Sequence, residues 1–188
     1  MAKLFSTILF AKPFAGLVAR QSAKRGFHFT SLNMIQVGEN IPSVDLYEGD
    51  PGHVINTGEF CQNKKVILFG VPGAFTPGCS KTHLPGYVQR YEDLKKKGVD
   101  EVACISVNDA FVMDAWGKAH EAAGKIRMLA DPEGTFTKLL GVDLNIPRLG
   151  GIRSKRYSMI VDKGVVTHIN IEPDGTGLSC SLAAKLPL

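Results

Sequence analysis

Four cysteines and the polar side chains near them are the residues of this 188-residue chain best suited to chemistry. They are Cys61, Cys79, Cys104 and Cys180, which are widely spaced and form no C-x-x-C pair. This spacing argues against a structural zinc site and against a redox dithiol. Cys79 and His83 are one helical turn apart, but no second pair of ligands accompanies them, so we expect no metal or other cofactor.

Cys79 follows a turn that contains two prolines and two glycines, residues 72–78. The apolar run before it, residues 65–71, is typical of a strand buried on both faces of a sheet. Apolar residues at helical spacing predict a helix over residues 82–97, so Cys79 lies at a helix start. Free backbone N–H groups and the helix dipole favour an anion there, which for cysteine is the nucleophilic thiolate. An inert buried cysteine in a rigid turn is the alternative.

The rest of the chain alternates strand-like and helix-like segments. The pattern predicts β runs at 44–46 and 54–55, a strand at 99–107, a helix capped at 108–109 and ending at 123, a strand at 126–130, a short helix at 136–140, a hairpin of 157–161 with 165–171, and a last helix at 178–185. This order predicts an α/β, thioredoxin-like fold with a central mixed sheet flanked by helices. Cys61 has no partner near it in sequence, so we expect a spectator thiol that is either at the surface or half-buried.

A length of 188 residues suits one domain with a leader. With 44% of its residues apolar, the chain can bury a hydrophobic core. Residues 1–33 contain no acid but several Arg, Lys, Ser and Thr residues, the composition of a mitochondrial transit peptide, and residues 34–188 form the domain. A secretory signal is less favoured, since Ser6 and Thr7 interrupt its apolar core. We expect no membrane association, because no run of about 18 apolar residues occurs. The ending KLPL does not support a peroxisomal address, and a cytoplasmic pool stays open.

The net charge of +4 lies in the leader. Five basic residues and no acidic one precede Glu39, and without them 17 basic residues face 18 acidic ones, a balance of −1. A nucleic-acid partner needs a basic face on the folded domain, so we expect none.

Four stretches of the chain resemble peroxiredoxins. Residues 71–85, VPGAFTPGCSKTHLP, resemble the peroxidatic signature, and in this long form the atypical two-cysteine subclass called peroxiredoxin five. The match continues in VACISVNDAF (102–111), KRYSM (155–159) and EPDGTGLSCS (172–181). It spans roughly residues 35–184, although 139–153 is not a close match.

The resemblance implies a role for each residue around the turn. Cys79 is the nucleophile that attacks the peroxide, and Thr76 with the amides of Gly78 and Cys79 holds the peroxide oxygens. Pro72 shapes the pocket. Arg156 lies beside the sulfur and favours the thiolate. From the sequence pattern alone, Arg156 cannot be distinguished from the arginines at 148 and 153.

The resemblance also implies a function and partners. The expected activity is reduction of hydrogen peroxide and alkyl hydroperoxides, with peroxynitrite as a further candidate substrate and thioredoxin as electron donor. Cys180 would form a disulfide with oxidised Cys79, and the protein would be a monomer or weak homodimer. Cys104 stays open as the disulfide partner, although a cysteine inside a strand moves less easily than one in a glycine-rich loop. A non-enzymatic redox sensor and a one-cysteine peroxidase fed by glutaredoxin are the alternatives.

Overall fold

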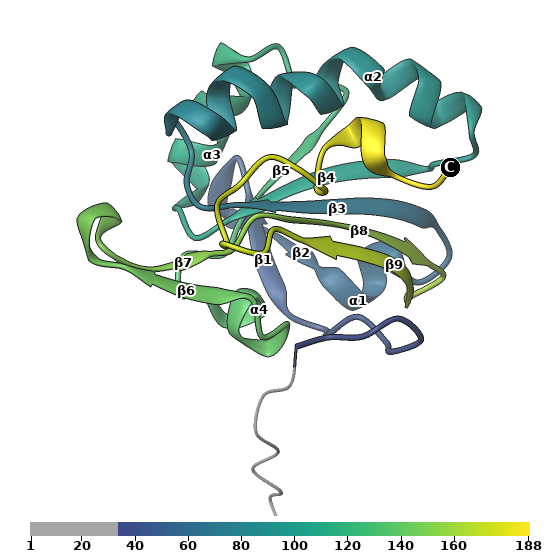
Figure 1. The fold of residues 1–188 in the computed structure, drawn as a ribbon, viewed down its shortest axis with the longest axis horizontal. Helices are drawn as coiled ribbons and strands as arrows, with labels where there is room; N and C mark the ends of the chain where they lie inside the picture. Colours follow the sequence, from purple (N-terminus) through teal and green to yellow (C-terminus); the bar gives the residue numbers. More distant parts are fainter. Residues whose placement is uncertain (1–33) are drawn as a thin grey trace, which may run out of the picture. The chain divides into compact units, whose positions relative to one another are not determined.

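A seven-stranded mixed sheet is the centre of this computed structural model, which describes residues 34–188 (Figure 1). The strand order is β2-β1-β5-β4-β3-β8-β9. Three parallel strands form its middle: β3 (Lys65–Val71), β4 (Glu101–Ser106) and β5 (Arg127–Ala130). The predicted central strand is confirmed as β3, whose residues from Val66 to Val71 are all buried. The predicted transit peptide at 1–33 lies outside the described residues.

Antiparallel strands extend the sheet on both sides. On one side, β8 (Tyr157–Asp162) pairs with β3, and β9 (Val165–Ile171) pairs with β8, which confirms the predicted hairpin. On the other side, β1 (Asp45–Glu48) pairs with β5 and with β2 (Asp50–Asn56). The expected mixed sheet is therefore present. The turn residues between the strands allow the chain to reverse in both hairpins, β1–β2 and β8–β9.

Helices cover both faces of the sheet (Figure 1). One face carries α2 (Leu84–Lys96) and α3 (Ala110–Ala119), and the other carries α1 (Thr57–Cys61) and α4 (Thr135–Leu139). Because side chains alternate along β3, Phe69 packs in the core under α2, whereas Leu68 packs in the core on the opposite face. None of the described helices is long and apolar enough to span a membrane.

The helix that follows the cysteine turn starts at residue 77, passes through a π-helical turn, η1 (Cys79–His83), and continues as α2. The N–H of Leu84 bonds to the carbonyl of Cys79, five residues back, immediately before Pro85. Proline has no N–H to donate and its ring collides with the carbonyl four residues earlier, so a wider turn there accommodates Pro85. Helical structure begins at residue 77, which confirms that Cys79 lies in the first turn.

The second, two-stranded sheet was not expected. It consists of β6 (Asp143–Ile146) and β7 (Gly151–Ser154), joined by the short helix η2 (Pro147–Leu149). It projects from the side of the main sheet (Figure 1). The strands are short and largely exposed or half-buried, so they lack the apolar alternation from which strands are recognised.

Two predicted helices are shorter than expected. The helix expected to end at 123 stops at Ala119, and α3 is capped by Asp109, whose side chain accepts from Val112 N. The predicted helix at 178–185 is wrong apart from the 3-10 turn η3 (Ala183–Lys185). Its first residues are bends, because their side chains and N–H groups bond to Glu172 and not to a helix.

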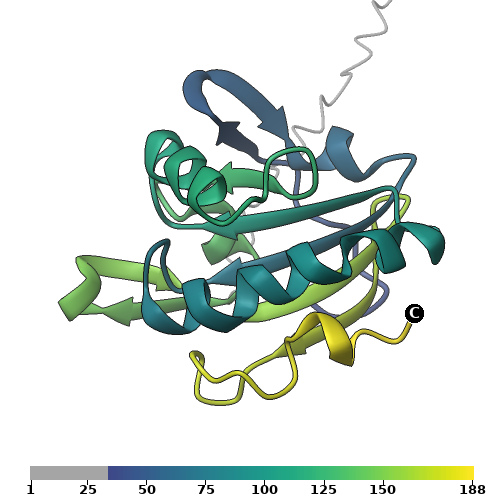
Figure 2. The same ribbon diagram turned by 90° about the horizontal axis from the view of Figure 1, so that it is seen from above.

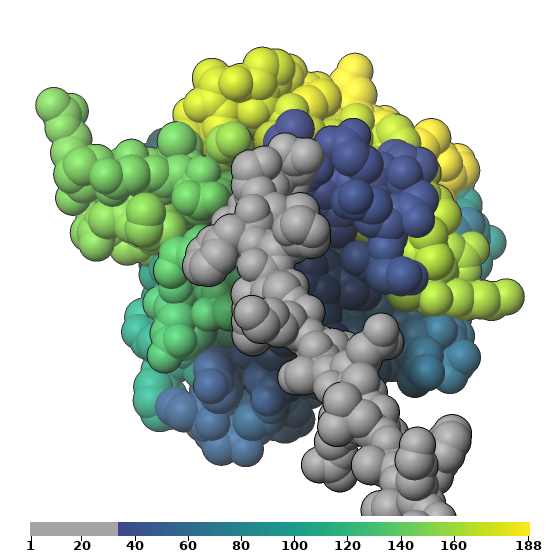
Figure 3. Space-filling model, turned by 90° about the horizontal axis from the view of Figure 1, so that it is seen from below, coloured from purple at the N-terminus to yellow at the C-terminus, as the bar shows by residue number. Residues whose placement is uncertain are grey.

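Two segments near the ends of the described chain pack against elements that are distant in sequence. The C-terminal segment runs beside α2 (Figure 2), where Lys97 Nζ donates to Leu188 O. The segment around Gly38 lies beside the β8–β9 turn (Figure 3), with Gly38 N bonded to Val166 O and Ile41 N to Gly164 O.

Candidate active site

Two hydrogen-bond donors converge on the sulfur of Cys79. Thr76 Oγ1 lies 2.8 Å from Cys79 Sγ, and Arg156 Nη1 lies 3.3 Å from it. Cys79 itself is buried. A hydroxyl and a cation that donate to a sulfur stabilise negative charge on it, so the arrangement suits a nucleophilic thiolate.

Arg156 reaches Cys79 from the residue just before β8, the position expected at a strand end. The side chain is 3% exposed, and its Nε donates to Thr176 O at 3.1 Å. Its backbone pairs with the same loop, since Arg156 N donates to Gly175 O at 2.7 Å and Glu172 N donates to Arg156 O at 3.0 Å. These bonds fix the guanidinium against the sulfur.

The structure shows which of the three arginines that the sequence pattern could not distinguish contacts the Cys79 sulfur. Arg148 is exposed in η2. Arg153 donates to Val107 O and to Leu149 O, so it braces the β6–β7 hairpin. Only Arg156, of these three, contacts the Cys79 sulfur.

Close packing of backbone around the sulfur depends on Gly78. A Cβ on Gly78 would stand 3.2 Å from Arg156 Nη2, tighter than ordinary contact, so a larger residue would displace the guanidinium. The N–H groups of Gly78 and Cys79 belong to the first helical turn, where no intrahelical acceptor is available. Pro72 is buried at the end of β3, next to the turn.

The turn is also tied to the neighbouring strand and helix by residues that the sequence did not single out. Ala74 N donates to Asn108 Oδ1 at 3.0 Å, and Ser106 Oγ donates to the same oxygen at 2.8 Å. Trp116 Nε1 donates to Ser80 Oγ at 3.0 Å. Trp116 is the single tryptophan of the chain, so its fluorescence reports on the residue next to Cys79.

Cys180 lies in the loop after β9 and is not bonded to Cys79, since both are free thiols. It is half-buried, and its Sγ lies 3.5 Å from Ile171 O. Burial raises the pKa of the Cys180 thiol, and the nearby charge of Glu172 raises it further.

Two other cysteines are buried without a donor to the sulfur among the recorded hydrogen bonds of residues 34–188. Cys104 lies inside β4, and burial raises the pKa of its thiol well above the ordinary value. The expectation of a surface or half-buried thiol at Cys61 is wrong, because Cys61 is fully buried. Cys61 ends α1, which packs on the sheet, and burial raises the pKa of its thiol to about 12. Both sulfurs are therefore neutral and unreactive at neutral pH.

His83 connects the Cys79 helix to the C-terminal segment. Its ring is 1% exposed and packs edge-on against Phe69 and Tyr87. Its Nε2 lies 3.0 Å from Ser181 O, and a carbonyl only accepts, so Nε2 carries the proton. Burial lowers the pKa of His83 to about 4, so the ring is neutral at physiological pH.

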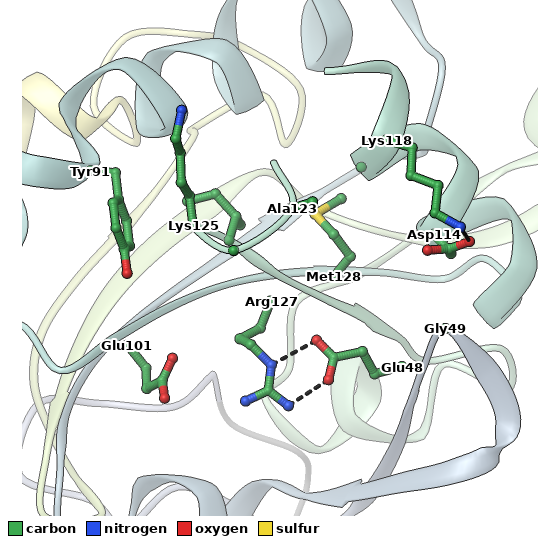
Figure 4. Close-up of a pocket in the computed structure, with 13 residues that line it drawn as sticks. Glu48, Gly49, Tyr91, Glu101, Asp114, Lys118, Ala123, Lys125, Arg127 and Met128 are labelled. Carbon is green, nitrogen blue, oxygen red and sulfur yellow. Dashed lines mark hydrogen bonds and ion pairs between the residues drawn. The ribbon is translucent and has the colours of Figure 1, made fainter. Parts of the chain in front are cut away.

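A pocket among the described residues lies away from Cys79. About 440 Å³ in volume, it is lined by β1, β4, β5 and α3 residues and by Tyr91, and it contains none of the predicted site residues (Figure 4). Its charges largely pair with each other: Arg127 with Glu48, and Lys118 with Asp114. Within residues 34–188, no cluster of three or more His, Cys, Asp or Glu side chains could hold a metal ion.

Comparison with known proteins assigns the class. Residues 36–185 match the Redoxin family. Peroxiredoxin-2D of Arabidopsis thaliana is 44% identical over 145 residues, which cover 75% of this chain and 90% of that protein. Peroxiredoxin-2E of the same plant, described as chloroplastic, is 44% identical over 148 residues, covering 75% of this chain and 63% of that protein.

Solved structures agree with this assignment. Reduced Prx3 of Vibrio vulnificus in complex with H₂O₂ is 46% identical, with a TM-score of 0.76, and the match covers 81% of this chain and 96% of that chain. Peroxiredoxin 5 of Alvinella pompejana is 44% identical, with a TM-score of 0.70 and coverage of 76% and 92%.

The chain therefore belongs to the Redoxin family, with the thioredoxin-like α/β fold of that family. Within the family it is a peroxiredoxin, a thiol-dependent peroxidase that acts on hydroperoxides.

Proposed function

We propose that Cys79 is the peroxidatic cysteine of this enzyme and that Thr76, Arg156, Gly78 and Pro72 complete its site. The observation that carries this proposal is the pair of donors on Cys79 Sγ, at 2.8 Å from Thr76 and 3.3 Å from Arg156. The same donors suit a peroxide, because a hydroxyl, a guanidinium and the free amides of Gly78 and Cys79 stabilise the charge that builds on the leaving oxygen.

The first step breaks the O–O bond of the peroxide. The Cys79 thiolate attacks the nearer oxygen, sulfur is oxidised to a sulfenic acid, and the other oxygen leaves as an alcohol or as water after taking a proton. Thr76 and Gly78 are half-exposed, so the peroxide approaches the buried sulfur past them. Hydrogen peroxide and alkyl hydroperoxides are the substrates, with peroxynitrite as a further candidate.

The second step joins Cys79 to Cys180. The Cys180 thiolate attacks the sulfenic sulfur, the S–O bond breaks, and the departing hydroxide combines with the thiol proton as water. Thioredoxin then reduces the disulfide by thiol exchange. The buried strand position of Cys104 and its raised pKa favour Cys180 over Cys104 as the partner.

This chemistry is that of the atypical two-cysteine subclass, peroxiredoxin five type, acting as a monomer or weak homodimer. The composition of residues 1–33 supports delivery to mitochondria, with residues 34–188 as the mature domain. A chloroplastic relative supports an organellar destination in general.

A coupled assay tests the proposal. NADPH, thioredoxin reductase, thioredoxin and the protein are mixed with hydrogen peroxide, and we expect steady NADPH oxidation. Cys79→Ser removes the nucleophile with little change in volume, so activity falls below a few per cent while thermal unfolding stays near that of the parent. Residual turnover above that level would contradict the role of Cys79. Turnover supported by glutaredoxin but not by thioredoxin would favour the one-cysteine alternative.

A further inference from the structure

A single buried carboxylate holds the loop that carries Cys180. Glu172 is 1% exposed and follows the last residue of β9. Its Oε1 accepts from the N–H groups of Ser179 at 2.8 Å, Cys180 at 3.0 Å and Ser181 at 2.9 Å, and from Ser181 Oγ at 2.7 Å. Its Oε2 accepts from Ser179 Oγ at 2.6 Å.

These bonds, and no ion pair among residues 34–188, stabilise the charge of Glu172. Burial alone would raise the pKa of Glu172, but the donors from Ser179 and Ser181 outweigh it and lower the pKa to about 2. The carboxylate is therefore ionised at neutral pH. Hydrogen bonds to a charged acceptor are about twice as strong as neutral ones, so the three residues 179–181 are held firmly.

The same loop is attached to the Cys79 helix. Ser181 O accepts from Tyr87 Oη at 2.8 Å and from His83 Nε2 at 3.0 Å. His83 belongs to η1, the π-helical turn that begins at Cys79, and Tyr87 follows in α2. Asn170 Nδ2 also donates to Cys180 O at 3.0 Å. Hydrogen bonds therefore hold Ser179 and Ser181 on either side of Cys180, and also the N–H and the carbonyl of Cys180 itself.

We infer that Glu172 is a positioning residue for the resolving step: its carboxylate holds Cys180 in the loop while Cys79 reacts, and the disulfide forms only after the loop has left it. This inference rests on the proposed function. The sulfenic acid of Cys79 has two fates, since Cys180 can attack it or a second hydroperoxide can oxidise it to the sulfinic acid. The strength of the Glu172 contacts therefore sets how much enzyme is lost at high peroxide.

Replacing Glu172 by glutamine tests this. The amide of Glu172→Gln keeps one acceptor oxygen but presents an NH₂ group to donors and carries no charge. We expect the disulfide to form about tenfold faster after a peroxide pulse, the factor expected from the loss of one hydrogen bond to a charged group. The rate of the first step, read from peroxide consumption, stays unchanged. The sulfinic fraction at high peroxide, read by mass spectrometry, falls.

Asp174→Asn is the matched control. Asp174 lies in the same loop and accepts from Thr176 N and Gly177 N, but it makes no recorded bond to residues 179–181. This variant removes the same charge from an exposed position. We expect it to form the disulfide at the parent rate.

A pH profile separates loss of the Glu172 carboxylate beside Cys180 from a general loosening of the fold. The charge of Glu172 contributes to the raised pKa of Cys180, so in Glu172→Gln the midpoint of the disulfide-forming rate moves to lower pH. His83 and Asp174 are the other titratable groups that interact with this carboxylate, and both variants retain His83. A general loosening of the fold would raise the rate without moving the midpoint, and that result would overturn the inference.

If Glu172→Gln does not fold, the rate of disulfide formation is measured in Ser179→Ala instead. Ser179 is exposed, and its loss removes one bond to Glu172 Oε2, so a smaller acceleration is expected. Disulfide formation at or below the parent rate in the variant that folds overturns the inference. A parent protein that forms no Cys79–Cys180 disulfide contradicts the proposed function itself, and the two failures are thereby distinguished.

Discussion

Arg156 donates a 3.3 Å hydrogen bond to the sulfur of Cys79, which precedes it by 77 residues in the chain. Its Nε is bonded to Thr176 O, in the loop that leads to Cys180. One guanidinium thus contacts both the cysteine that would be oxidised and the loop of the cysteine that would resolve it.

Replacing Arg156 by glutamine should slow attack on hydrogen peroxide by about 10- to 100-fold, the cost of losing one hydrogen bond from a charged donor. Without the cation the thiolate is less favoured, so alkylation of Cys79 by iodoacetamide should also slow. Stopped-flow Trp116 fluorescence measures the first rate. Arg153→Gln is the control, since Arg153 contacts carbonyls and not the sulfur, and an equal loss there would contradict the assignment.

The cysteine variants should separate the two steps of the reaction. Cys180→Ser should consume one equivalent of peroxide at the parent rate and then stop cycling with thioredoxin, because the sulfenic acid has no internal partner. Cys104→Ser and Cys61→Ser should cycle normally, since both thiols are buried and neutral. Peptide mapping of peroxide-treated parent protein decides the pairing. A crosslink of Cys79 to Cys104, or no internal crosslink, would overturn the assignment of Cys180.

Acid should weaken the fold through His83. Its folded pKa of about 4 lies below the ordinary 6.5, so between these values the unfolded chain binds a proton that the folded chain does not. Neutral His83 contributes up to about 3 kcal/mol to the free energy of unfolding above pH 6.5. This contribution is lost as the pH falls to about 4. Glu172 also weakens the fold in acid, because its pKa is lowered from the ordinary 4.5 to about 2 in the folded chain. Its stabilising contribution is lost as the pH falls between these two values.

Urea unfolding at several pH values, followed by Trp116 fluorescence, measures this. His83→Gln retains an N–H donor for Ser181 O but does not titrate, so its free energy of unfolding should change less between pH 6.5 and 4 than that of the parent. His53→Gln, at an exposed position, should follow the parent. Parallel curves for all three proteins would show that His83 does not cause the loss.

Residues 1–35 fused to a soluble reporter should carry it into mitochondria, because the segment before Met34 is free of acids and contains arginine. Fluorescence microscopy against a mitochondrial marker checks this. A diffuse cytosolic signal would contradict the prediction. Residues 34–188 alone should retain full peroxidase activity, since every proposed site residue lies within them.

Much of the sheet could be predicted because its elements are defined by local patterns. The apolar run of β3 and the turn residues of the β8–β9 hairpin are each visible within a few residues. The β6–β7 hairpin was missed because its strands are short and carry little buried surface. The burial of Cys61 was missed because it depends on how α1 packs on the sheet, which no local pattern records.

The site was predictable in part for a similar reason. Thr76 and Cys79 are three residues apart in one turn, so their proximity follows from local geometry. Arg156 was selected by resemblance, because its place beside the sulfur depends on the pairing of β3 with β8. Glu172 lies in a stretch that resembles the family, but its role could not be predicted, since its partners lie seven to nine residues ahead in a loop without regular structure.

The burial of Cys61 and Cys104 bears on the fidelity of oxidation. Four cysteines can be joined completely in three different ways, and a chain that oxidises itself repeatedly risks every wrong pairing. Two of these sulfurs are enclosed on opposite faces of the sheet and stay protonated, so under the proposed mechanism Cys79 and Cys180 are the pair left for oxidation. Burial in the sheet would thus prevent incorrect pairings before they form, without any later rearrangement by thiol–disulfide exchange.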